Sequence, residues 1–150
     1  MRIYVYSDGS SKKKLGTCTS IIFSDNDFLG IVKEASTFKG NDKAELKGVI
    51  NGLDYIVSNK LDGSDIIVYT DHRSIVTSFY NRNTTISEND LTANLWKRLF
   101  SLTTKLHFEI RHIKSHQFKH NANKTCDILS KLKLYNKWNI MVIYFQDFKV

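Results

Sequence analysis

A continuous apolar run in the middle of the chain, from Ile66 to Tyr69, constrains the fold more than any other feature. It follows the turn residues Asp62-Gly63-Ser64, and no polar residue interrupts it, so a strand formed here would be buried on both faces. Strands of this kind are typical of parallel sheets, whose two faces are covered by other parts of the chain. The run therefore predicts a central strand of an α/β sheet.

Further strands and helices are predicted on both sides of this run. Strand-like stretches lie at residues 2–7, 16–24, 28–36 and 106–113. Apolar residues recur at helical spacing in residues 43–58 and 91–102, and further helices are expected at 73–80 and 124–134. This order predicts an α/β fold with a mixed five-stranded sheet, in which three antiparallel strands are followed by parallel ones and helices flank the sheet.

Composition and charge indicate the class of protein and the kind of partner it binds. The chain has 150 residues, so we expect a single domain over residues 1–150, in which residues 135–150 form an extension whose apolar part predicts an extra strand or a packing segment. With 22 Lys and Arg against 15 Asp and Glu, the net charge is +7, which favours a polyanionic partner such as nucleic acid. No apolar stretch is long enough for a membrane span, and no signal peptide is expected. The cysteines, Cys18 and Cys126, form no disulfide framework, and with no export signal we expect a cytoplasmic protein. The sequence does not give the oligomeric state, and a monomer is favoured.

Acidic residues follow two of the predicted strands. Asp8 comes directly after residues 2–7, and Asp71 comes shortly after the apolar run. Each has an ordinary explanation, because Asp begins turns and is a favoured N-cap of helices. If the first and fourth strands are adjacent and parallel, however, both carboxylates lie at the edge where open α/β sheets hold their sites.

Two further acids lie on predicted helices. Glu45 has the spacing of a capping box with Asp42, but it also shares a helix face with Val49 and Leu53, which aims it at the sheet. Asp127 lies near the start of the last predicted helix, where the helix dipole favours an acid. An acid on a buried face needs a partner, because an unpaired buried charge is costly.

Four acids at one end of a sheet in a basic protein indicate a metal site. Such close like charges repel one another unless cations neutralise them. Hard oxygen ligands suit Mg²⁺ or Mn²⁺, and two such ions about 4 Å apart stabilise the attacking and leaving oxygens of phosphodiester hydrolysis. We therefore expect Asp8, Glu45, Asp71 and Asp127 to bind metal.

Five segments carry a resemblance to a known family: Tyr6 to Ser10, Lys43 to Leu46, Val68 to Asp71, Ile113 to His116, and Asn123 to Asp127. In order, spacing and expected secondary structure, they resemble type 1 ribonuclease H over residues 2–134. No single segment is specific, whereas four acids in order, with a histidine before the last, are a strong signal. The resemblance implies the ribonuclease H-like fold and a metal-dependent endonuclease that hydrolyses the RNA strand of RNA–DNA hybrids by a two-metal-ion mechanism.

The same resemblance implies roles for individual residues. Asp8, Glu45, Asp71 and Asp127 match the metal-binding catalytic acids of the family, which points to Mg²⁺ or Mn²⁺, with two ions per site, as the cofactor. His116 matches a catalytic loop histidine that helps proton transfer or product release, a role suited to a group that titrates near neutral pH. Selectivity for hybrids would come from 2′-hydroxyl contacts and groove shape. The substrate contacts implied are Gly9, Ser10, Ser11, Asn41, Asp42, Arg73 and Asn123.

The chain departs from the family pattern beside the acids. Asp42 stands where the family often has an amide, and His72-Arg73 stand where Ser-Gln or a similar pair is usual, so substrate handling is expected to differ. The stretch between Asp71 and Trp96 is too short for the basic helical protrusion with which some members grip hybrids. Lysines that would compensate, or else form a solvated face, are Lys12, Lys13, Lys14, Lys119, Lys131, Lys133 and Lys137.

Three alternatives remain open from the sequence. The same fold carries nucleases that act on DNA, so the fold alone does not give the substrate. A non-catalytic nucleic-acid-binding module is the second, although the presence of all four acids and the histidine argues against it. The third is a zinc site formed by His112, His116, His120 and Cys126. Zinc is disfavoured because His112 lies in a strand-like stretch and no second cysteine is nearby.

Overall fold

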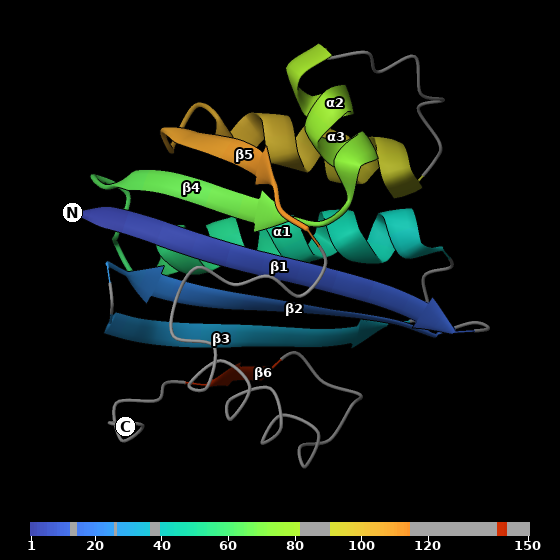
Figure 1. Ribbon diagram of the computed structural model, residues 1–150, viewed down its shortest axis with the longest axis horizontal. Helices are drawn as coiled ribbons and strands as arrows, with labels where there is room; N and C mark the ends of the chain where they lie inside the picture. Colours follow the sequence, from blue (N-terminus) through green and yellow to red (C-terminus); the bar gives the residue numbers. More distant parts are fainter. Residues whose placement is uncertain (13–14, 26, 37–39, 82–90, 115–140, 144–150) are drawn as a thin grey trace.

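The computed structural model describes residues 1–12, 15–25, 27–36, 40–81, 91–114 and 141–143. These residues form a six-stranded sheet and three helices (Figure 1). Along the chain the elements are β1 (Arg2–Lys12), β2 (Leu15–Ser24), β3 (Asp27–Ser36), α1 (Asn41–Ser58), β4 (Asp65–Thr70), α2 (Arg73–Asn81), α3 (Leu91–Leu102), β5 (Phe108–His112) and β6 (Met141–Ile143). The predicted helix at 124–134 lies outside the described residues.

The sheet has the mixed topology that the sequence predicts. Its strands lie in the order β5-β4-β1-β2-β3-β6. β1, β2 and β3 pair antiparallel, whereas β4 pairs parallel with β1, and β5 parallel with β4. β6 adds a short sixth strand, antiparallel to β3, from the C-terminal extension in which the sequence predicts an extra strand or a packing segment. The mixed arrangement of the first five strands is confirmed.

β4 lies inside the sheet and is buried on both faces, as its apolar run requires. Ile66 and Val68 belong to the larger apolar cluster, which also contains side chains of α1, α2 and α3. Ile67 and Tyr69 belong to a second cluster on the opposite face. Alternate residues of one strand point to opposite faces, so the two clusters lie on opposite sides of β4.

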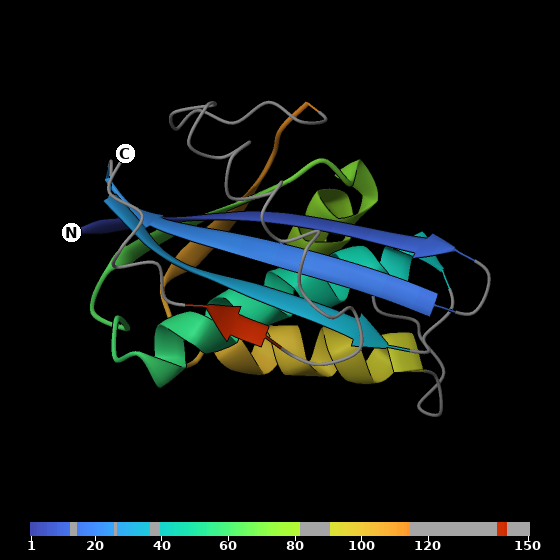
Figure 2. The ribbon, with the colours of Figure 1, turned by 90° about the horizontal axis from the view of Figure 1, so that it is seen from below.

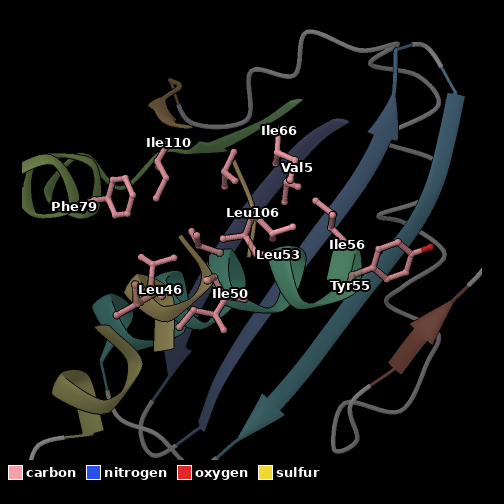
Figure 3. Packing of buried hydrophobic residues seen from close by; sticks show 14 of the residues in the cluster. Val5, Leu46, Ile50, Leu53, Tyr55, Ile56, Ile66, Phe79, Leu106 and Ile110 are labelled. Carbon is pink, nitrogen blue, oxygen red and sulfur yellow. The ribbon is translucent and has the colours of Figure 1, made fainter. Parts of the chain in front are cut away.

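The helices pack on one side of the sheet, where they form the larger core. Figure 2 shows α1 and α3 side by side beneath the strands. In the close view of Figure 3, Ile50 and Leu53 of α1 lie among Val5, Ile66 and Leu106 from the strands and the segment before β5. α1 is thereby held firmly against the centre of the sheet, which positions the first turn of this helix next to β1. None of the helices in the described part of the chain is long and apolar enough to cross a membrane.

β1 extends further than the sequence predicts. Its parallel pairing with β4 ends at Ser7, opposite Thr70, but its antiparallel pairing with β2 continues to Lys12, opposite Leu15. The expectation that the strand ends before Asp8 is therefore wrong, because β2 supplies backbone partners for the next five residues. Asp8 lies where β4 diverges from β1, rather than at the end of β1.

Candidate active site

Three acids from three elements meet at this divergence. Asp8 lies in β1, Glu45 in the second turn of α1, and Asp71 directly after β4. One oxygen of each carboxylate lies within 4.8 Å of the corresponding oxygens of the other two. The parallel register, in which Ser7 pairs with Thr70, brings Asp8 and Asp71 to the same edge of the sheet. The structure thus brings together three of the four acids that the sequence selects; Asp127 lies outside the described residues.

Glu45 is the buried member of this acidic cluster. Its residue is 5% exposed, and its Oε2 accepts no hydrogen bond from any described residue. Burial, followed by the negative charges of Asp8 and Asp71, raises the pKa of the Glu45 carboxyl to about 8, although a hydrogen bond from the Gly9 backbone opposes the rise. Buried polar atoms nearly always have a partner, so this oxygen calls for a hydrogen-bond donor or a cation.

The alternative explanations for the acids as helix caps are wrong. α1 begins at Asn41 after Gly40, which has a φ of 99°, and no side chain caps this end. Asp42 therefore lies within the first turn, two positions after the N-cap, and does not cap the helix as a capping box with Glu45 would require. α2 begins at Arg73, so the residue at its N-cap position is His72 rather than Asp71.

Gly9 lets β1 approach α1 closely beside the cluster. A Cβ atom at this position would lie 2.5 Å from the backbone nitrogen of Glu45 and 2.7 Å from the backbone oxygen of Ala44. Because these are main-chain atoms of a packed helix, a side chain at residue 9 would displace α1. The absence of a side chain at Gly9 therefore permits the position of Glu45 next to Asp8.

Ser11 of β1 and Asn41 at the start of α1 form a hydrogen-bonded pair. The Ser11 backbone N–H and hydroxyl both donate to Asn41 Oδ1, over distances of 2.8 Å and 3.1 Å. With its oxygen engaged in this way, the Asn41 amide can offer its NH₂ group to an acceptor on a ligand. Phosphate and 2′-hydroxyl oxygens are acceptors of this kind.

The sequence did not predict a second group of hydrogen-bonded polar residues near the start of α1 and of α2. Asp42 Oδ1 lies 2.7 Å from His72 Nε2, and Ser74 Oγ lies 2.8 Å from His72 Nδ1. The sequence marks Asp42 and His72 as departures from the family pattern, but it does not reveal their contact, and it gave no reason to select Ser74. The contact could have been predicted from the expected metal site, because Glu45 and Asp71 can meet only if the first turns of α1 and α2 are neighbours.

A partly buried polar cluster between α1, β2 and β3 was also missed. The Glu34 carboxylate of β3 accepts a 2.8 Å hydrogen bond from Asn51 Nδ2 and lies 3.9 Å from Lys47 Nζ. Cys18 of β2, opposite Gly9 in the sheet, places its thiol 3.9 Å from the same carboxylate, and burial raises the pKa of this thiol to about 12. Lys47 and Asn51 lie one turn apart on α1, so the cluster ties this helix to β3.

The structure describes some of the remaining predicted residues and not others. Arg73 is exposed at the start of α2, and Ser10 lies in β1. His112, one of the proposed zinc ligands, ends β5, as its strand-like surroundings predict. The residues that lie outside the described part of the chain are His116, His120, Asn123, Cys126, Asp127, Lys13, Lys14, Lys119, Lys131, Lys133 and Lys137.

One comparison with known proteins identifies a family. A sequence model of the family described as RNase H matches residues 1–134. A comparison with curated protein sequences finds no match.

Solved structures resemble the chain in fold. RNase H1 from the halophilic archaeon Halobacterium salinarum is 19% identical, with a TM-score of 0.65, over 77% of this chain and 87% of that one. LC11-RNase H1, crystallised in complex with an RNA/DNA hybrid, is 14% identical, with a TM-score of 0.66, over 75% and 86% of the two chains. LC9-RNase H1, described as a type 1 RNase H with the type 2 active-site motif, is 16% identical, with a TM-score of 0.69, over 97% and 78%.

Proposed function

Because this chain belongs to the RNase H family and is thus a ribonuclease H, we propose that it hydrolyses the RNA strand of RNA–DNA hybrids with the help of divalent cations. The cations would be Mg²⁺ or Mn²⁺, two per site, held by Asp8, Glu45, Asp71 and Asp127. The observation that carries the proposal is the cluster of three described carboxylates, one of which, Glu45, has a buried oxygen with no hydrogen-bond partner among the described residues.

The residues present fit a hard cation. Three carboxylates supply the oxygen ligands that Mg²⁺ and Mn²⁺ prefer. Their mutual repulsion, which contributes to the high pKa of Glu45, would be relieved by positive charge between them. When bound, a divalent cation there would supply Lewis-acid chemistry, which activates water and stabilises a leaving oxygen.

The polypeptide itself would bind and orient the hybrid. A net charge of +7 attracts the two phosphate backbones, and the NH₂ group of Asn41, which lies about one helical turn before Glu45, can donate to their oxygens or to a 2′-hydroxyl. The LC11 relative has been crystallised with an RNA/DNA hybrid, which supports the same substrate class here. His116 is proposed to assist proton transfer or product release, and Gly9, Ser10, Ser11, Arg73 and Asn123 to lie along the hybrid.

The proposal extends to the protein as a whole. We propose that residues 1–150 act as one domain and that the protein works as a monomer in the cytoplasm. The buried, free thiol of Cys18 agrees with a reducing compartment.

A four-substrate assay tests the proposed function. Labelled RNA–DNA hybrid, double-stranded RNA, double-stranded DNA and single-stranded RNA would each be incubated with Mg²⁺, Mn²⁺ or EDTA. We expect cleavage of the RNA of the hybrid alone, and only with a metal. Cleavage of DNA would instead indicate a DNA nuclease with this fold, and binding without cleavage would indicate a binding module.

Substitution of one acid ties the activity to this site. Asp8→Asn should reduce cleavage at least 100-fold, because one charged oxygen ligand of the cations is lost, while the circular dichroism spectrum stays unchanged. Asp62→Asn is the matched control, since Asp62 is exposed in the turn before β4. If Asp8→Asn cuts hybrids as fast as Asp62→Asn does, the acidic cluster is not the active site.

A further inference from the structure

A chain of three polar side chains connects α1 with the turn between β4 and α2. Asp42 Oδ1 and Ser74 Oγ lie 2.7 Å and 2.8 Å from the two ring nitrogens of His72. Because a carboxylate only accepts hydrogen bonds, the His72 Nε2–H donates to Asp42, and in the neutral ring Nδ1 then accepts from the Ser74 hydroxyl. The two partners therefore fix both the position and the orientation of the imidazole.

The main chain of His72 is held as well. Its N–H donates to Thr70 Oγ1 over 3.2 Å, and its carbonyl oxygen accepts from the Ile75 N–H over 3.1 Å. Thr70 is fully buried, and its carbonyl oxygen accepts a hydrogen bond from Ile113. Asp71 is thus flanked by two residues that are each anchored, so its backbone has little freedom to move.

The Asp42–His72 hydrogen bond joins the segments that carry two of the acids. Asp42 lies three residues before Glu45, on the adjacent turn of α1, and His72 directly follows Asp71. Glu45 and Asp71 repel each other when both are charged. This bond is a side-chain link between the first turn of α1 and the turn after β4, and it opposes their separation.

Stability alone does not account for this link. The Asp42 side chain is 78% exposed, and exposed pairs contribute little to the free energy of unfolding. A hydrogen bond of good length in such a place can still fix an orientation. Partners behind metal ligands commonly act in this way, and their removal typically weakens metal binding 10- to 100-fold.

We propose that Asp42 and Ser74, through His72, are positioning residues that hold Glu45 and Asp71 at the separation required by a divalent cation. This inference rests on the cation site of the proposed function. It gives Asp42 a role different from the substrate contact that the family resemblance implies, and it explains how an acid and a histidine can stand together beside the acidic cluster.

Calorimetric titration of the full-length, hybrid-free protein with Mn²⁺ tests the inference without any assay of cleavage. Asp42→Ala should bind Mn²⁺ about tenfold more weakly, at the low end of the usual range, because the link acts through a neighbour of the ligand. Asp42→Asn keeps an oxygen that can accept from His72 and should bind nearly as tightly as the wild type. Asp54→Ala is the matched control, since it removes an acid from the same helix whose 2.6 Å ion pair with Arg98 is remote from the cluster.

The variants separate geometry from charge. If Asp42→Asn loses as much affinity as Asp42→Ala, the charge of Asp42 matters rather than its hydrogen bond, and the inference is wrong. Unchanged affinity in Asp42→Ala also overturns it, while leaving the proposed function intact. If the wild type binds no Mn²⁺, the cation site itself fails, and the inference fails with it.

A double-mutant cycle provides a second readout. His72→Ala should weaken Mn²⁺ binding about as much as Asp42→Ala, and the double variant should be no weaker than either, because both changes break the same bond. Additive losses would contradict the link. All variants should melt close to the wild type in EDTA, and Ser74→Ala should show a smaller loss of affinity in the same direction.

Discussion

At the scale of single residues, Glu45 is a carboxyl group that the fold holds in an unfavourable environment. Its carboxyl is buried between α1, to which it belongs, and β1. Burial, together with the charges of the two neighbouring acids, raises its pKa to about 8. Without a cation, the folded state tolerates this group best when it is protonated. The group therefore makes the stability of the metal-free protein depend on pH.

The sign of this dependence follows from the two pKa values. The unfolded Glu45 loses its proton near pH 4.5, and the folded one near pH 8, so the folded state holds more protons between these values. The free energy of unfolding in EDTA should fall as the pH rises from 4.5 to 8, by about 1–3 kcal/mol after solvent screening is allowed for. In Glu45→Gln this contribution disappears, so the variant should gain stability relative to the wild type as the pH rises.

Thermal melts in EDTA at pH 5, 6, 7 and 8 measure this effect. Added Mg²⁺ should stabilise the wild type more at pH 8 than at pH 5, because the cation binds the ionised carboxylate. Parallel pH profiles for the wild type and Glu45→Gln would show that Glu45 titrates as it does in the unfolded chain.

Sequence reasoning finds residues whose position depends on local pattern and misses those whose partners are distant. Asp8 and Asp71 are selected because each follows an apolar strand, and Glu45 because of its phase with Val49 and Leu53. The contact of Asp42 with His72 has no such local signal, since it depends on how α1 packs across two strands. The Glu34 cluster was missed for the same reason.

At the scale of elements, the contact between β1 and α1 sets the geometry of the site. β1 continues beyond Asp8 because the next strand, β2, pairs with it as far as Lys12, and no pattern within residues 1–12 indicates this pairing. The extra length carries Gly9 beneath the first turns of α1, where main-chain atoms leave no room for a side chain. The main chains of β1 and α1 are therefore in direct contact at Gly9, beside Asp8 and Glu45.

Gly9→Ala should disturb the site and the fold together. The new methyl group would overlap main-chain atoms of Ala44 and Glu45, so α1 must shift, and overpacking of this kind typically costs about 1–3 kcal/mol. We expect a lower melting temperature and weaker Mn²⁺ binding, as measured by thermal melts and calorimetry. Gly63→Ala is the matched control, because a Cβ there meets no atom within 4 Å. If the two variants have the same melting temperature and the same Mn²⁺ affinity, α1 can shift at residue 9 without loss of stability.

At the scale of the whole molecule, a basic protein surrounds an acidic site. The net charge of +7 favours a polyanion such as the proposed hybrid, whereas the cluster of Asp8, Glu45 and Asp71 would repel a phosphate that approached it. Divalent cations between the carboxylates would resolve this conflict locally. Under the proposed function, the two kinds of charge would serve separate steps, capture of the polyanion and placement of one phosphodiester group.

This separation predicts how salt affects binding. Hybrid affinity of the Asp8→Asn variant, measured by fluorescence anisotropy so that no cleavage interferes, should fall roughly tenfold or more between 50 and 200 mM KCl, because each phosphate contact releases counterions. Mg²⁺ affinity of the wild type should change less, since the carboxylates lie close together and Glu45 is buried. Hybrid affinity that is independent of salt would mean that groove contacts rather than lysines and arginines hold the substrate, so the basic surface would have no part in capture.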